Sequence, residues 1–288
     1  MPRWLLWSLV ALVSWGIWAL LSKLIGDALS AAQSQALSTI GLLPVMAVLA
    51  SGKSGSRVSS SRRGIAPALA AGILSCLGNV AYYHALNMGG KAATVIPLTA
   101  LYPLVTIVLA LLLLKESLNT TQLAGIAISL AAIYLLNVQS EGGFLSRWLA
   151  FALIPIALWG VPDLLQKMAT NHASGEVSTL WFLLAFVPVA IVILLTQPWP
   201  QQITSKTWLL VGALGLFFSL GNYALLAAFA SQGKASIITP LTALYPVVSV
   251  PMAIFFLGEK VGEREWLGIG LALASVAALS YEKPANTE

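Results

Sequence analysis

Asp163 is the acidic side chain whose surroundings point most strongly to chemistry. It is the only acidic residue well inside one of the long apolar stretches of this sequence, in the segment Trp-Gly-Val-Pro-Asp that opens at Trp159. A carboxylate in apolar surroundings costs free energy, so it is a candidate functional group by default. Lys167 follows four residues later and could neutralise it in an ordinary i, i+4 ion pair. Proton coupling through Asp163 and a structural pair with Lys167 are both open interpretations.

Two other apolar stretches each contain a pair of prolines and a stripe of polar side chains. A proline inside a helix removes a backbone donor and leaves a carbonyl without its partner, so each pair predicts a kink or hinge. The stripe residues are spaced i, i+3 and i+7, which places them on one helical face. The prolines are Pro97, Pro103, Pro240 and Pro246, and the stripes are Thr99, Tyr102 and Thr106, then Thr242, Tyr245 and Ser249.

The polar stripes should face inward, because polar groups exposed to an apolar environment are costly. We expect Tyr102 and Tyr245, with Thr99 and Thr242, to line a central cavity and bind a small molecule. The alternative is that the tyrosine hydroxyls satisfy carbonyls freed by the prolines, which would then be simple packing kinks.

Further residues are candidates for the same cavity. Asn79 and Asn222 form a matched pair beside Gly78 and Gly221, and cavity lining and hydrogen bonding between helices are equally open for them. His84 has no such match, since Ala227 stands at the corresponding position, and it is either structural or protonating. Trp15 and Trp159 also recur as a pair and could shape the cavity or simply pack.

The composition places these residues in a membrane protein. Hydrophobic residues make up 58% of the 288, and charged residues only 9%, whereas a soluble domain is about 25% charged. Crossing a bilayer takes about 20 mostly apolar residues in a helix, and ten stretches qualify as candidates. They are residues 4–25, 33–50, 65–87, 92–114, 121–138, 148–168, 177–196, 207–229, 235–257 and 265–281. The fold class is therefore an all-α integral membrane protein with ten transmembrane helices.

An internal repeat divides these helices into two sets. Residues 90–103 read GKAATVIPLTALYP and residues 233–246 read GKASIITPLTALYP, a displacement of 143. Each half therefore contains the same five-helix unit, and we expect the repeats to span 1–140 and 146–281. Because five is odd, the second unit must enter the membrane from the opposite side, which gives two inverted repeats.

The sequence resembles the EamA family of the drug/metabolite transporter superfamily. The resemblance rests on the duplicated Pro-containing fourth helix, the Lys-Glu at 115–116 and Gly-Glu-Lys at 258–260 that end it, and the Gly-rich fifth helix. It implies a transporter of a small organic metabolite working by alternating access. Because no ATP site is evident, transport is expected to be facilitative, exchange-type or secondary active, and a proton or a counter-substrate is a candidate coupling partner. The relatives handle amino acids, nucleotide sugars, sugar phosphates and other metabolites. No basic residue is evident deep in a span, which favours a neutral, zwitterionic or aromatic solute.

Two other functions fit the same architecture: a flippase for a lipid or lipid-linked solute, and a membrane scaffold or receptor that transports nothing. An enzyme is not expected, because two histidines and one intramembrane carboxylate offer no catalytic or metal-binding cluster. No cofactor is expected either. The triplet Gly52-Lys53-Ser54 lacks the earlier glycine of a phosphate-binding loop, since position 47 is alanine.

The basic residues predict an orientation. The net charge of +5 could suggest nucleic acid, but the dense basic segment, residues 53–63, links two expected spans. Positive loops stay in the cytoplasm, so this segment and Arg3 place the N-terminus inside, and ten spans return the C-terminus there. We expect a multi-pass protein of the plasma membrane, the cytoplasmic membrane of a bacterium, with both termini cytoplasmic.

Overall fold

The computed structural model describes residues 2–51, 62–114, 119–137, 147–200, 202–231, 235–279 and 281, and every regular element in these ranges is a helix. The expected basic link at 53–63 and the boundary between the repeats at 140–146 lie largely or wholly outside them. The first half contains α1 (Arg3–Ile25), α2 (Ala31–Ser38), η1 (Thr39–Leu42), α3 (Leu43–Ser51), α4 (Arg62–Asn87), α5 (Ala92–Thr99), α6 (Pro103–Leu114) and α7 (Thr120–Asn137). The second half contains α8 (Arg147–Thr170), α9 (Gly175–Leu184), α10 (Phe186–Thr196), α11 (Ser205–Ala230), α12 (Ala235–Ala243), α13 (Pro246–Leu257) and α14 (Glu263–Leu279).

Several of these helices are suited to a membrane. Among the described residues, six helical segments are long and apolar enough to cross one: Arg3–Ile25, Ala31–Ser51, Arg62–Asn87, Trp148–Thr170, Gly175–Thr196 and Ser205–Ala230. The other expected spans are shorter or interrupted, as α5 with α6, α7, α12 with α13, and α14. The all-helical membrane fold is confirmed, and the number of ten spans stays a prediction.

Prolines break two of the expected spans at matching places. In the first half α5 ends at Thr99 and α6 begins at Pro103, and in the second half α12 ends at Ala243 and α13 begins at Pro246. Proline has no N–H to donate to the preceding turn, and it is well suited to the first position of a helix, so a new helix begins there. The breaks lie at Pro103 and Pro246, whereas the helix continues through Pro97 and Pro240, and a hinge at these prolines stays a prediction.

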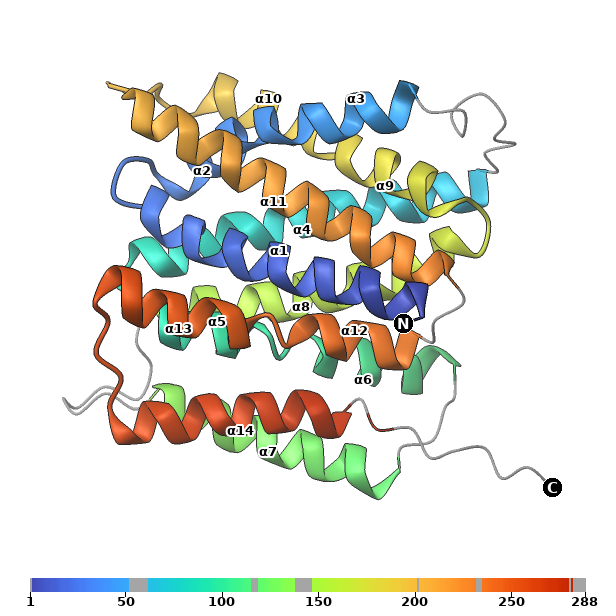
Figure 1. Ribbon diagram of the computed structural model, residues 1–288, viewed down its shortest axis with the longest axis vertical. Helices are drawn as coiled ribbons and strands as arrows, with labels where there is room; N and C mark the ends of the chain where they lie inside the picture. The colour runs from blue at the N-terminus through green and yellow to red at the C-terminus, as the bar shows by residue number, and fades with distance from the viewer. Residues whose placement is uncertain are drawn as a thin grey trace.

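The two halves pack against each other through paired helices. The closest partners are α4 with α8, α1 with α11, and α7 with α14, each pair joining one helix from either half. In Figure 1 the helices lie roughly side by side and are stacked from α3 and α10 at one end to α7 and α14 at the other. The centre of the stack, where α1, α4, α8 and α11 meet, is therefore the place where a cavity between the halves would form.

Candidate functional site

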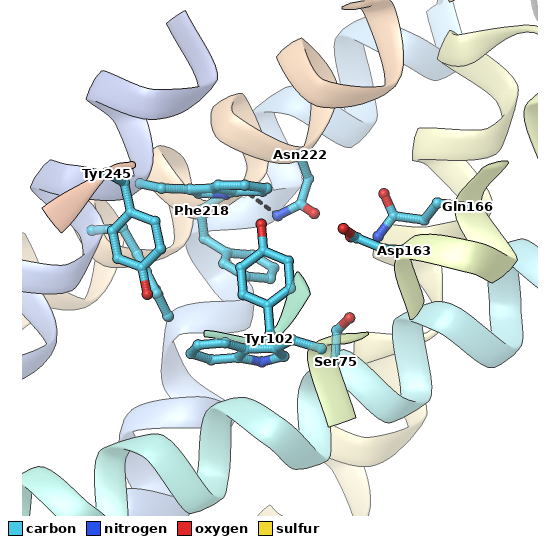
Figure 2. Close-up of a pocket in the computed structure, with 10 residues that line it drawn as sticks. Ser75, Tyr102, Asp163, Gln166, Phe218, Asn222 and Tyr245 are labelled. Atoms are coloured by element: carbon cyan, nitrogen blue, oxygen red, sulfur yellow. Dashed lines mark hydrogen bonds between the residues drawn. The ribbon is translucent and has the colours of Figure 1, made fainter. Parts of the chain in front are cut away.

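A cavity lies between the two halves, bounded by α1, α4, α8, α11 and the two proline breaks (Figure 2). The space inside it open to the centres of water molecules is about 50 Å³, room for only a few waters. A solute would therefore need the walls to move apart. The lining residues are Trp15, Trp18, Ser75, Tyr102, Trp159, Asp163, Gln166, Phe218, Asn222 and Tyr245.

The proline breaks and two Trp-Gly pairs position the tyrosines. Tyr102 and Tyr245 each directly precede the proline that restarts a helix. A Cβ at Gly160 would lie 2.6 Å from the Tyr102 carbonyl oxygen, and one at Gly16 would lie 3.2 Å from that of Tyr245. Glycine therefore lets α8 and α1 approach the broken backbone closely, which brings the preceding tryptophans, Trp159 and Trp15, beside the tyrosines.

Gly78 and Gly221 make room for the two indoles. A Cβ at Gly78 would lie 2.6 Å from Trp159 Nε1, and one at Gly221 would lie 2.5 Å from Trp15 Nε1. At each of these glycines, the group that approaches closely is therefore an indole ring from the other half.

The hydrogen bonds of the two indoles break the symmetry. Trp159 Nε1 donates to Asn79 Oδ1 at 3.2 Å, but Trp15 Nε1 has no hydrogen-bond partner in the part of the chain that the structure describes. The matching Asn222 instead donates from Nδ2 to the Phe218 carbonyl of its own helix at 2.9 Å. One indole N–H is therefore satisfied within the protein, and the other is available to a ligand.

We expect Gly221→Ala to push the Trp15 indole into the cavity and weaken solute binding. A half-buried indole held between helices cannot move aside as a flexible side chain can. Overpacking typically costs about 1 to 3 kcal/mol, which corresponds to about 5- to 150-fold in affinity if the bound state bears the cost. Gly212→Ala on the same helix is the matched control, since nothing lies within 4 Å of its added Cβ. Equal solute affinity in the two variants, measured on purified protein, would show that the Trp15 position is unimportant.

Four buried polar atoms in the cavity wall have no hydrogen-bond partner among the described residues: Asp163 Oδ2, Gln166 Oε1, the Tyr102 hydroxyl and Trp15 Nε1. Asp163 is 6% exposed, Tyr102 4% and Gln166 3%. Figure 2 shows the Tyr102 hydroxyl, the Asp163 carboxylate and the Asn222 amide pointing toward a common space. Buried polar groups are almost always hydrogen-bonded, so this concentration of unpartnered atoms indicates a place prepared for a ligand or water.

Asp163 does not pair with Lys167. Both residues are described, yet the ion pair found among the described residues joins Lys91 and Glu265. The structure therefore gives no support to the structural-pair interpretation of Asp163, and its carboxylate faces the cavity instead.

Aromatic rings form most of the remaining wall. The Trp18 ring lies 5.8 Å from that of Trp159 and 5.5 Å from that of Phe218, measured between centroids. Trp15 and Tyr245 meet edge to face at 6.4 Å, as do Tyr102 and Trp159 at 6.3 Å. These contacts give the cavity a rigid aromatic surface around its polar groups.

Four lining residues were not predicted from the sequence: Trp18, Ser75, Gln166 and Phe218. Trp18 and Gln166 follow Trp15 and Asp163 by three residues, a spacing that shares a helical face, and this signal could have found them. Ser75 and Phe218 carry no signal that distinguishes them from other residues of their helices.

Several predicted residues lie outside the lining. The His84 ring packs edge to face on Phe151 with centroids 4.3 Å apart. The buried hydroxyls of Thr99 and Thr242 donate to carbonyls three residues earlier, and Thr99 Oγ1 also lies 3.4 Å from the Tyr245 hydroxyl. Asn79 does not line the cavity but accepts the hydrogen bond of Trp159, which does. Pro97, Pro103, Pro240 and Pro246 shape the backbone and are not among the lining residues.

Comparison with known proteins agrees with this architecture. A protein of Sinorhizobium sp named "Uncharacterized transporter in cobO 3'region" is 26% identical over 136 residues, which cover 46% of this chain and 96% of the relative. An uncharacterized protein of Methanocaldococcus jannaschii is 26% identical over 133 residues, 46% of this chain and 95% of the relative. Both relatives thus match about half of this chain along nearly their whole length.

The fold also has a solved counterpart, described only as "Crystal structure of protein". It superposes with a TM-score of 0.69 at 19% identity, covering 95% of this chain and 94% of the other. The family model described as "EamA-like transporter family" matches twice, over residues 2–138 and 146–281. The chain therefore belongs to the EamA-like transporter family of the drug/metabolite transporter superfamily.

Proposed function

We propose that this membrane transporter moves a small organic solute by alternating access, with the central cavity as the solute site. The observation that carries the proposal is the set of four unpartnered buried atoms at the junction of the two halves. In transporters built from inverted repeats the solute site lies at the interface between repeats, next to broken helices. The aromatic wall favours a solute with an apolar or aromatic part.

Coupling and orientation belong to the same proposal. Transport is secondary active or an exchange, with a proton or a second solute as partner, and Asp163 is the residue through which a proton would act. The protein resides in the plasma membrane, as a bacterial cytoplasmic membrane protein, with both termini in the cytoplasm. The repeats meet between residues 140 and 146.

A transport screen tests the function. The purified protein is reconstituted into proteoliposomes, and these vesicles are loaded with a metabolite pool. The loss of each solute from the vesicles is measured with and without a proton gradient and compared with its loss from protein-free vesicles. Selective loss of one class of small solute is the expected result. Movement of labelled lipid without solute would replace the proposal with a flippase, and absence of movement of either would point to a scaffold or receptor.

Tyr102→Phe is expected to weaken solute binding more than Tyr245→Phe does. The Tyr102 hydroxyl makes no hydrogen bond within 3.5 Å in the described part of the chain, although Thr242 lies near it, whereas the Tyr245 hydroxyl lies 3.4 Å from Thr99 Oγ1. Loss of one hydrogen bond to solute costs about 0.5 to 1.5 kcal/mol, up to about tenfold in affinity. Tyr281→Phe, outside the cavity, is the control. If both cavity variants reach the membrane in normal amounts and bind solute with normal affinity, the tyrosine stripe has only a structural role.

A further inference from the structure

We propose that the cavity recognises a protonated organic amine, whose ammonium group lies between Asp163, Gln166 and the aromatic wall. The inference rests on the proposed function and names the chemical class of its solute. It departs from the sequence-based expectation of a neutral, zwitterionic or aromatic solute, because it prefers a cation.

Two acceptor atoms, Asp163 Oδ2 and Gln166 Oε1, have no partner within the described ranges and belong to residues three apart on α8 that line the same cavity. Both atoms accept hydrogen bonds and neither donates one when Asp163 is ionised. An ammonium group supplies N–H donors to both and a positive charge for the carboxylate. Water could donate to them too, but it could not supply that charge.

The charge balance of the lining favours a cation over a zwitterion. Asp163 is the one charged residue among the ten that line the cavity within the described part of the chain, and none of the ten is basic. A carboxylate on the solute would therefore have no cationic partner and would lie close to Asp163. A buried charge without a partner is costly, so an amino acid should bind less tightly than the corresponding amine.

The aromatic wall supports the same class. Three tryptophans, Trp15, Trp18 and Trp159, line the same cavity as Asp163 and Gln166, and Tyr102, Phe218 and Tyr245 complete its aromatic wall. Cations are attracted to aromatic faces, most strongly to that of tryptophan and more so where water is excluded. The rings would hold the apolar part of the solute and the flank of its ammonium group.

The two halves differ at the positions of Asp163 and Gln166, which should fix the orientation of a bound solute. At the repeat displacement of 144 residues, Asp163 corresponds to Ala19 and Gln166 to Ser22. The Ser22 hydroxyl is already used, donating to the Trp18 carbonyl at 2.7 Å. The pair of acceptors at Asp163 and Gln166 on α8 thus has no counterpart at the matching positions of α1, so the amine end of a solute should face the second half.

Three ligands that share one ring and one two-carbon chain test the proposal: 2-phenylethylammonium, the neutral 2-phenylethanol and the zwitterion L-phenylalanine. Binding is measured by calorimetry on the full-length protein in lipid nanodiscs. We expect the ammonium compound to bind about tenfold or more tightly than either of the others, the scale of one charge-assisted hydrogen bond. Equal affinities, tighter binding of the zwitterion, or no binding of any of the three would overturn the amine class.

Asp163→Asn keeps the shape of the side chain and removes its charge. It should lower the preference for the ammonium compound over the alcohol by about 10- to 100-fold. Asp27→Asn, which alters an exposed acid outside the cavity, is the control and should leave the preference unchanged. If Asp163→Asn does not fold, Gln166→Leu takes its place, with several-fold weaker ammonium binding expected. An unchanged preference in the folded variant contradicts the proposal.

The transport screen separates this inference from the function on which it rests. If the protein transports a neutral or acidic solute while the amine fails to bind, the transporter function stands and the amine class is wrong. If labelled lipid moves and no small solute does, both are wrong.

Discussion

Gly215→Ala is expected to prevent the protein from accumulating in folded form. A Cβ at this position of α11 would overlap the carbonyl oxygen of Ser38 and lie 2.7 Å from the Cα of Gly41. All of these neighbours are backbone atoms, so no side-chain rotation relieves the overlap. Overpacking a tight contact costs about 1 to 3 kcal/mol and sometimes more, and a backbone clash should lie at the upper end. That loss is a large part of the stability of a typical domain.

The measurement is the yield of monodisperse protein in detergent and its thermal midpoint. Gly212→Ala, one turn earlier on the same helix, adds the same methyl group with nothing within 4 Å and serves as the control. Gly72→Ala should behave like Gly215→Ala, because its Cβ would overlap the carbonyl of Phe182, which corresponds by repeat to Ser38. Normal yield from Gly215→Ala would show that α11 does not need this contact with η1.

The helical membrane fold and its duplication could be predicted because the length of apolar runs and internal similarity are read directly from the sequence and do not depend on how the helices pack. The sequence did not reveal that the segments 31–51 and 175–196 are also broken, at Thr39–Leu42 and between Leu184 and Phe186. Pro44 and Pro188, which match by repeat, lie in the first turn of the helices that follow these breaks. Proline is favoured in a first turn because its missing N–H would be unpaired there. The signal was present and could have been used.

The site was only partly predictable for a different reason. Asn79 and Asn222 occupy equivalent sequence positions, yet Asn79 bonds an indole and Asn222 bonds its own helix. A side chain's partner depends on the detailed approach of helices from the other half, which one sequence does not encode locally. For the same reason Thr99 and Thr242 share a helical face with the tyrosines but turn their hydroxyls back to carbonyls.

Glu259→Gln is expected to loosen the side of the molecule opposite the N-terminus, at the left of Figure 1, where the link between α13 and α14 in the second half meets α5 in the first half. The Glu259 carboxylate of the second half accepts the backbone N–H groups of Ala92 and Ala93, both at 2.8 Å, at the start of α5 in the first half. Gly258, with φ of 63°, ends α13 in a left-handed turn directly before Glu259 and sets its direction. A carboxylate at a helix N-terminus also interacts favourably with the helix dipole.

This contact should matter more than the ion pair beside it. Lys91 and Glu265 meet at 2.8 Å with side chains 47% and 25% exposed, and such pairs contribute about 0 to 1 kcal/mol. Hydrogen bonds to a charged acceptor contribute about 1.5 to 3 kcal/mol each, and a glutamine can keep only one of the two. The proposed alternating access requires this end to open, so the substitution should favour the open form by about tenfold or more.

Labelling of a cavity cysteine measures that opening. With the buried Cys76 replaced by alanine, Ser75→Cys in the cavity wall is treated with an impermeant thiol reagent from each side of the membrane. Glu259→Gln should raise the labelling rate about tenfold from the side of the α5 N-terminus. It should lower the rate from the other side, because in alternating access opening one side of the cavity closes the other. Glu263→Gln, an exposed acid at the same end, should change neither rate. A rise from both sides would mean general loosening of the fold, and no change would mean that Glu259 does not hold the halves together.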